Sequence, residues 1–167
     1  MDLMQFDQTT LYFDDPLSPE IEQLLREAGD CYGQAEAEAL LLRAYFLAPE
    51  QLMVLVALYR YYFYQHRLED ALKVADRSLE VAGRRLDLPA HWQHLHPDHI
   101  GHAVLRSMGL LRFYLMVLKA AGYIHLRLGN TVAGVAMLEK LGELDDHDRL
   151  GGKALLEVVR AEQEILE

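Results

Sequence analysis

The side chains with the clearest capacity for chemistry are histidines gathered in one short segment. Five of the eight histidines fall between positions 91 and 102: His91, His94, His96, His99 and His102. Steps of three residues place His91 with His94, and His99 with His102, on common faces of a helix. Imidazole pairs at this spacing can bind zinc, copper, nickel or haem iron. The five histidines are therefore a candidate metal site.

The same segment has an interpretation without a metal. No cysteine lies nearby, and the HExxH and CxxCH motifs are absent. An exposed, partly packed loop could use its histidines to cap helices and to flank Trp92. Elsewhere no serine-histidine-acid grouping or glycine-rich phosphate loop can be placed, so we expect no catalytic activity.

The elements that must position this segment are helices. In the stretch 52–82, four residues recur at the spacing of one helix face: Leu55, Leu58, Tyr59 and Tyr62. After a polar turn at 65–67, a second apolar face is rebuilt by Leu68, Ala71, Leu72 and Ala75. The pattern predicts two antiparallel helices that approach closely through the small alanines.

This stretch resembles the tetratricopeptide repeat, a helix-turn-helix unit of about 34 residues. Its large and small residues stand at the positions of the family motif: Leu55, Leu58, Tyr59, Tyr62, Ala71, Ala75 and Ser78. A preceding frame begins at Ser18-Pro19-Glu20, a helix-start signal, and carries the pattern at Ile21, Leu24, Leu25, Ala28, Ala37, Leu41, Ala44 and Pro49. Pro49 lies three residues before Leu52, so the two frames abut in register.

A third frame follows at a distance. It carries the motif at Leu118, Ala121, Gly122, His125, Gly134, Leu138 and Leu141, with Gly129-Asn130 as its turn. Leu55 and Leu118 are 63 residues apart, about 29 more than direct stacking would give. Either the flanking helices are extended or a helical pair is inserted. Pro97 favours the insertion, because proline suits the start of a helix and not its interior.

The resemblance implies an all-α fold, with antiparallel helical hairpins stacked as a short right-handed solenoid. We expect an acidic and aromatic arm at 1–17, followed by a single domain at 18–167. Its segments would be repeats at about 18–51, 52–83 and 115–146, a histidine-rich helical insertion at 84–114, and a C-terminal capping helix at 150–167.

The resemblance also implies a binding site. In this family the first helices of the hairpins line a concave face, whose inward positions here are Arg26, Met53, Val56, Arg60, Phe63, Tyr64, Met116, Lys119, Tyr123 and Arg127. Basic groups among apolar side chains suit a peptide with apolar anchors and some negative charge. The alternative is that part of this surface packs on the insertion. Docking of a chaperone's C-terminal carboxylate is not expected, because Glu22, Ala57 and Ala120 replace the required polar or basic residues.

Composition limits the partners and the compartment. The 26 acidic and 16 basic side chains give a net charge of -10, which argues against nucleic acid or an anionic membrane as the main partner. Cys31 is the single cysteine, which excludes an internal disulfide and fits a reducing compartment. The N-terminus is acidic, unlike a signal peptide, and no apolar run reaches about 18 residues. We therefore expect a cytoplasmic protein.

Two apolar features suggest contacts beyond one hairpin. The aromatic run at 59–64 covers more than one side of its helix, so we expect part of it to face other segments, a partner or a second copy in a homodimer. The arm at 1–17 either packs on the first helix or lies in the groove as a built-in ligand.

The expected function is a non-catalytic module that holds a peptide or client protein, as a scaffold or chaperone-like adaptor. In size, acidity and repeat number the chain is similar to secretion chaperones built from three such repeats. The alternative is a metal- or haem-dependent adaptor or assembly factor that works through the histidine-rich insertion.

Overall fold

The computed structural model describes the backbone of residues 15–166 and the side chains of residues 15–162. This part of the chain forms seven α-helices, one short 3₁₀-helix and no strand: α1 (Pro19–Asp30), α2 (Ala35–Leu47), α3 (Leu52–Tyr64), α4 (Leu68–Arg85), η2 (Trp92–His94), α5 (Pro97–Arg127), α6 (Thr131–Leu144) and α7 (Gly152–Leu166). The all-α prediction is confirmed. The expected arm lies, up to residue 14, outside the described residues.

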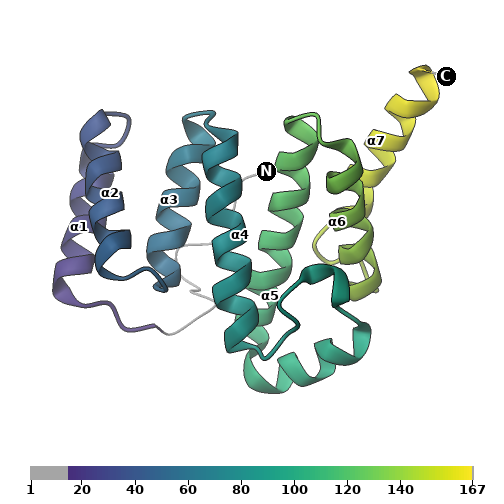
Figure 1. Cartoon of the computed structure of the whole chain (residues 1–167), viewed down its shortest axis with the longest axis horizontal. Coiled ribbons are helices and arrows are strands. Elements are labelled where there is room, and N and C mark those ends of the chain that lie inside the picture. Colours follow the sequence, from purple (N-terminus) through teal and green to yellow (C-terminus); the bar gives the residue numbers. More distant parts are fainter. Residues whose placement is uncertain (1–14, 167) are drawn as a thin grey trace.

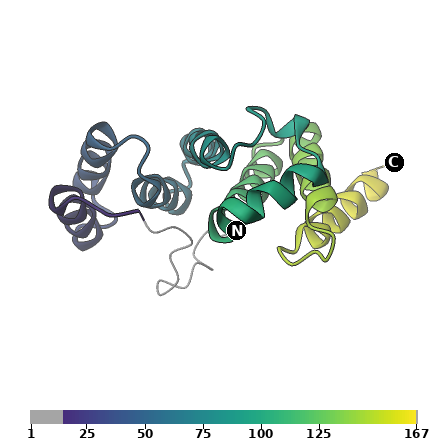
Figure 2. The same ribbon diagram turned by 90° about the horizontal axis from the view of Figure 1, so that it is seen from below.

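The helices form a row in which each packs against the next along the chain (Figure 1). Seen from below, α1 and α3 lie in one row and α2 and α4 in the other (Figure 2). The first helices of the first two hairpins therefore share one side of the molecule.

Local signals in the sequence account for where these helices begin and turn. Ser18 caps α1, because its hydroxyl oxygen accepts a hydrogen bond from the Ile21 backbone N–H at 3.3 Å, and Pro19 follows at the first helical position. Between α3 and α4, His66 takes a left-handed conformation with φ 57°, and Gly129 does so between α5 and α6 with φ 81°. Both turns lie where the sequence predicts them.

The segment between the second and third frames differs from the expected helical pair. After α4 the chain runs through η2, and α5 then begins at Pro97 and continues into the third frame. Ser107 interrupts α5 with extended backbone angles, φ -165° and ψ 107°. Its hydroxyl accepts a hydrogen bond from the Leu110 N–H at 3.1 Å, so Ser107 caps the second part of α5. The insertion thus adds one helical segment joined to the next helix by a capped kink.

The hairpin of α5 and α6 packs closely because glycines face each other across it. A Cβ at Gly134 would lie 2.8 Å from the Gly122 carbonyl oxygen and 2.7 Å from the Leu126 side chain. At Gly122 it would lie 3.2 Å from Cγ of Leu138. Gly134 thus has room for hydrogen only, and a side chain at Gly122 would require its neighbours to shift.

The last helix, α7, packs on α6 at the end of the row. Leu156 is buried there, and Arg160 forms an ion pair of 3.2 Å with Glu139 of α6. Among the described residues, no helix has both the length and the apolar character that crossing a membrane requires.

Candidate functional site

The predicted inward residues of α3 form one strip of partly exposed side chains. Met53, Val56, Arg60 and Phe63 are half-buried, and Tyr64 at the end of the helix is 38% exposed. On the other side of α3, Leu55, Leu58 and Tyr62 are buried. The strip is therefore partly exposed to solvent, on a helix whose opposite side is buried in the core.

An aromatic contact joins this strip to α5. The ring centroids of Phe63 and Tyr123 are 6.4 Å apart, and Tyr59 stacks on Phe63 at 5.7 Å. Arg127 donates a hydrogen bond to the Tyr123 hydroxyl at 2.9 Å. The structure therefore brings predicted residues of the second and third frames together, although they are about 60 positions apart.

Lys119 has a different environment from the one its position suggested. Its ammonium donates a hydrogen bond to the Leu150 carbonyl oxygen in the loop between α6 and α7. Burial lowers the pKa of Lys119, and the carboxylates of Asp148 and Asp145 partly offset that shift. Lys119 therefore holds this loop, which makes it a structural residue rather than an open contact for a client.

The remaining predicted residues lie apart from the aromatic contact. Arg26, on α1, is exposed and forms an ion pair of 3.0 Å with Glu22. Met116, on α5, is half-buried. Arg26 is thus at the outer helix of the row, and Met116 belongs to the same helix as Tyr123.

A small hollow adjoins the strip at Arg60. It measures about 180 Å³ and lies between α1, α2 and α3, lined by Leu25, Ala28, Gly29, Tyr32, Leu41, Ala57 and Arg60. The Tyr32 hydroxyl donates a hydrogen bond to the Arg60 carbonyl oxygen at 3.4 Å. Apolar walls next to a guanidinium group could receive a side chain of a bound peptide.

A larger pocket, of about 530 Å³, lies beside the kink of α5. It is lined by Ile100, Val104, Met108, Leu111, Arg112, Leu115, Leu144, Asp145, Asp146, His147, Arg149 and Leu150. Sequence reasoning missed this pocket, because its walls come from α5 and from the loop after α6. The only signal was the helical spacing of Ile100, Val104 and Met108, which predicted a face without naming what would lie opposite.

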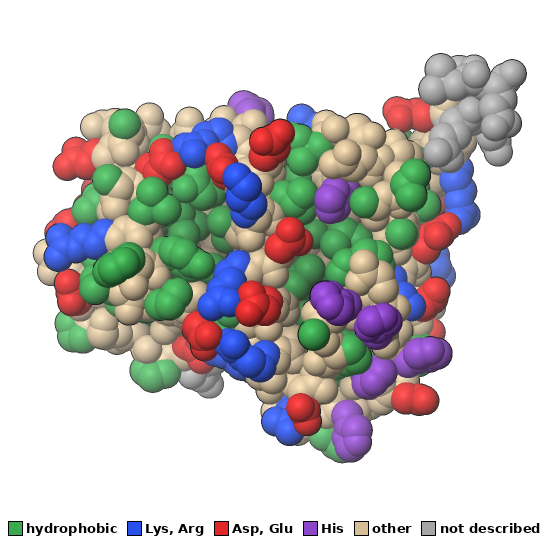
Figure 3. Space-filling model, in the orientation of Figure 1, with side chains coloured by type: hydrophobic (Ala, Val, Ile, Leu, Met, Phe, Trp, Pro, Cys, Tyr) green, Lys and Arg blue, Asp and Glu red, His purple; other side chains and the backbone are tan. Residues whose placement is uncertain are grey.

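The histidines are distributed over separate local contacts. The rings of His91 and His94 meet edge to face with centroids 5.9 Å apart. His96 and His99 form the cap of α5: the His96 N–H donates to Nδ1 of His99 at 3.0 Å, and the His99 N–H donates to the His96 carbonyl oxygen at 3.0 Å. His102 is exposed. Figure 3 shows histidine side chains at the surface of this part of the molecule.

The contacts of these histidines differ from those of a metal site. Within the described part of the chain, no three His, Cys, Asp or Glu side chains gather in a way that could hold a metal ion. The caps at His96 and His99 match the interpretation without a metal. Metal binding by the five histidines stays a prediction, and a ligand set would require them to leave these positions.

The aromatic run at 59–64 is mostly enclosed by neighbouring helices. Tyr59, Tyr61 and Tyr62 are buried. Tyr61 packs edge to face on Tyr32 at 5.9 Å, while the Tyr62 hydroxyl donates a hydrogen bond to Glu38 at 3.1 Å. As expected, one hairpin does not bury the run alone, since residues before α3 and on α5 complete its packing.

Comparison with known proteins supplies a relative. A protein of Azotobacter chroococcum mcd 1, named as an uncharacterized 19.8 kDa protein in the nifW 5′ region, is 51% identical over 159 residues, which cover 95% of this chain and 89% of the relative. The chain belongs to the family of this nifW 5′-region protein. No family model matches the chain, and no solved structure matches it significantly.

Identity at this level over nearly the whole chain indicates a shared fold. We therefore expect the helix row and the strip on α3 to recur in the nifW 5′-region protein of Azotobacter chroococcum mcd 1. The relative's name states no activity, so the function has to be argued from the site itself.

Proposed function

We propose that the protein is a non-catalytic binding module that holds a peptide or a segment of a client protein. The proposal includes the finer fold: about three tetratricopeptide-like hairpins stacked as a short solenoid, with α7 as the capping helix. The client would lie along α1, α3 and the second part of α5, contacting Arg26, Met53, Val56, Arg60, Phe63, Tyr64, Met116, Tyr123 and Arg127. Lys119 is left out of this set because it holds the loop at Leu150.

The aromatic contact between α3 and α5 is the observation that carries this proposal. The ring centroids of Phe63 and Tyr123 are 6.4 Å apart, which supports a client surface shared by their two helices. Hollows adjoin α3 at Arg60 and α5 at Arg112. Aromatic side chains flanked by pockets are typical of positions that contribute most of the affinity at protein interfaces.

The side chains on this surface favour a client with apolar anchors and acidic groups. Arg60 and Arg127 supply guanidinium groups, which bind carboxylates in a planar, often bidentate geometry. The chain carries a net charge of -10, so basic groups on this face would also select where an acidic client approaches.

The relative's name suggests which client to test first. It places the relative's gene in the 5′ region of nifW, so the nifW product of Azotobacter chroococcum mcd 1 is a reasonable first partner. We also propose a cytoplasmic location, which the single cysteine and the acidic composition support.

Quantitative affinity capture tests the proposal. The full chain and the double variant Arg60→Glu with Arg127→Glu would be used as baits in an extract of the native organism, with bound proteins quantified by mass spectrometry. We expect a defined set of proteins to be lost at least about tenfold with the double variant, because reversing two charges removes the carboxylate contacts.

The control carries the same type of change on another surface. Arg160→Glu alters an exposed arginine of α7, whose ion pair with Glu139 lies away from the strip. This variant should capture the same proteins as the unchanged chain. Equal capture by all three baits would contradict the proposal.

A further inference from the structure

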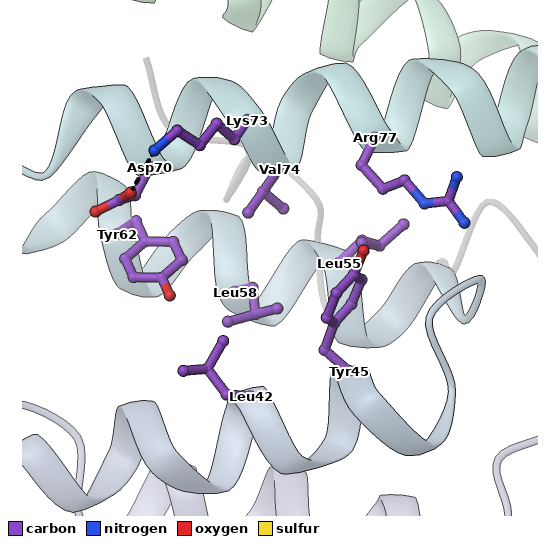
Figure 4. A pocket seen from close by; sticks show the side chains of 9 residues that line it. All are labelled: Leu42, Tyr45, Leu55, Leu58, Tyr62, Asp70, Lys73, Val74 and Arg77. Carbon is purple, nitrogen blue, oxygen red and sulfur yellow. Dashed lines mark hydrogen bonds and ion pairs between the residues drawn. The ribbon is translucent and has the colours of Figure 1, made fainter.

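A second apolar groove lies on the opposite side of α3 from the client strip. It has a volume of about 250 Å³ and runs between α2 and α4, with α3 as its floor (Figure 4). Its lining residues are Leu42, Tyr45, Leu55, Leu58, Tyr62, Asp70, Lys73, Val74 and Arg77. Arg60 and Phe63 point away from it, because they fall on the other face of the α3 helix.

A large apolar side chain projects beside this groove. Phe46 of α2 is 85% exposed, and it follows Leu42, a groove-lining residue that is 44% exposed, by one helical turn. Residues four apart lie on the same side of a helix. One surface over α2, α3 and α4 therefore carries both a projecting ring and an apolar recess. Figure 3 shows hydrophobic side chains gathered over these helices.

The charges around the groove are balanced at both of its ends. At one end Arg67 and Lys73 pair with Glu38 and Asp70, with Arg67 to Glu38 at 2.7 Å and Lys73 to Asp70 at 3.2 Å. At the other end two bases pair with two acids, namely Arg77 and Arg84 with Glu50 and Glu80. Four bases thus face four acids, so the net charge of -10 resides outside this set.

This balance decides what kind of partner the face can receive. A second copy of an acidic chain is repelled wherever net negative charge faces net negative charge, but the repulsion is screened over a Debye length of about 8 Å at physiological ionic strength. The neutral rim therefore lets two copies approach here. Because these eight charges pair with one another, they do not favour an acidic or a basic client.

We propose that this face binds a second copy of the chain, with Phe46 of each copy seated in the groove of the other. A two-fold dimer uses the same surface on both copies, so the surface must be complementary to itself. A projecting ring next to a recess meets that condition, because one rotation places both rings in both recesses. The two client strips would then lie on outer sides of the dimer and allow bivalent binding.

Mass measurement of the full chain in solution tests the dimer. By light scattering or sedimentation at a chain concentration of about 100 μM, well above a micromolar Kd for a standard interface, we expect the mass of two chains. Phe46→Glu should give the mass of one chain, since it places a charge in the apolar recess. Val132→Glu is the matched control: Val132 of α6 is 88% exposed and lies away from α2–α4, so this variant should remain a dimer.

A second variant makes the test specific to the groove. Val74→Arg blocks the recess and should also give single chains. Mixing the Phe46→Glu and Val74→Arg proteins should restore a dimer, because the introduced carboxylate faces the introduced guanidinium while the other ring and recess are intact. Three results would each overturn the proposal: single chains at about 100 μM for the unchanged protein, a dimer that survives Phe46→Glu, or no dimer after mixing. The proposal would be overturned in the same way if the groove binds an apolar peptide and the chain stays single.

Discussion

The hairpins α3–α4 and α5–α6 follow one helical plan but distribute size in opposite ways. Positions 63 residues apart correspond, so Tyr59 matches Gly122 and Ala75 matches Leu138. The first hairpin has a large residue on its first helix and a small one on its second, and the second hairpin has the reverse. All four are buried. In each hairpin a large buried residue on one helix thus goes with a small one on the other, and we call this reversal the size exchange.

Between the two hairpins, corresponding residues share backbone conformation but can differ in their side-chain contacts. His66 and Gly129 correspond, and both take left-handed conformations in the turns. Val56 and Lys119 also correspond, yet Val56 lies on the client strip while Lys119 reaches the Leu150 carbonyl oxygen. Position in the frame therefore fixes the direction of a side chain more reliably than it fixes its partner.

The largest expected effect comes from breaking the size exchange. Leu138 is fully buried, so Leu138→Ala should lower the free energy of unfolding by about 2–5 kcal/mol through lost burial and a cavity. The mirror change, Ala75→Leu, should cost about 1–3 kcal/mol by overpacking, because Ala75 is buried and a larger side chain would need space. Chemical denaturation measures both. A stabilising Ala75→Leu would show that the first hairpin has space to spare and would refute the exchange.

The next effect concerns the glycine contact that only the second hairpin has. In Gly134→Ala the new methyl group would meet the Gly122 carbonyl oxygen at 2.8 Å, so we expect a loss of about 1–3 kcal/mol. Gly142→Ala in the same helix has nothing within 4 Å of its new methyl group and should gain about 1 kcal/mol from helix propensity. Thermal or chemical denaturation should therefore give opposite signs for the two variants, and equal signs would contradict the packing described.

The contrast between Lys119 and Arg60 predicts separate losses of stability and binding. Lys119→Met removes a charged hydrogen bond and should cost about 1–2 kcal/mol while leaving client capture unchanged. Arg60→Met should reduce client capture, because it removes the guanidinium group that the proposed client contacts. If Lys119→Met weakened capture as much as Arg60→Met, the assignment of Lys119 to the loop alone would be wrong.

The smallest expected effect concerns the pKa values of two buried tyrosines, which are raised for different reasons. Burial raises the pKa of Tyr114 to about 12, and burial together with Glu38 raises that of Tyr62 to about 12, from an ordinary value of 10.0. The folded state then holds these protons more tightly than the unfolded chain, so their stabilising contribution is complete below pH 10 and is lost between about pH 10 and 12.

The Glu38→Gln variant should separate the two tyrosines. It should lower the pKa of Tyr62 and leave that of Tyr114 in place, because Tyr114 is shifted by burial alone. Ultraviolet absorbance of the phenolates, followed through an alkaline titration in Tyr62→Phe and Tyr114→Phe backgrounds, would assign each transition. An unchanged Tyr62 transition in Glu38→Gln would contradict the role given to Glu38.

The sequence predicted those features that depend on neighbouring residues. The cap at Ser18, the turns at His66 and Gly129, and the helix start at Pro97 follow from local propensity and spacing. The kink at Ser107, the partner of Lys119 and the pocket beside Met108 do not, because they depend on how the loops after α4 and α6 return to α5. These loops carry few periodic residues, and their positions are set by packing.

Hydrogen–deuterium exchange on the complex with a captured client tests the central claim most directly. If the client lies on the strip, binding should slow amide exchange in α3 (Leu52–Tyr64) and in residues 116–127 of α5, with exchange in α2 and α4 unchanged relative to the free protein. Slowed exchange confined to α2 and α4, or to the segment 86–106 that carries the five histidines, would contradict the account and place the client elsewhere.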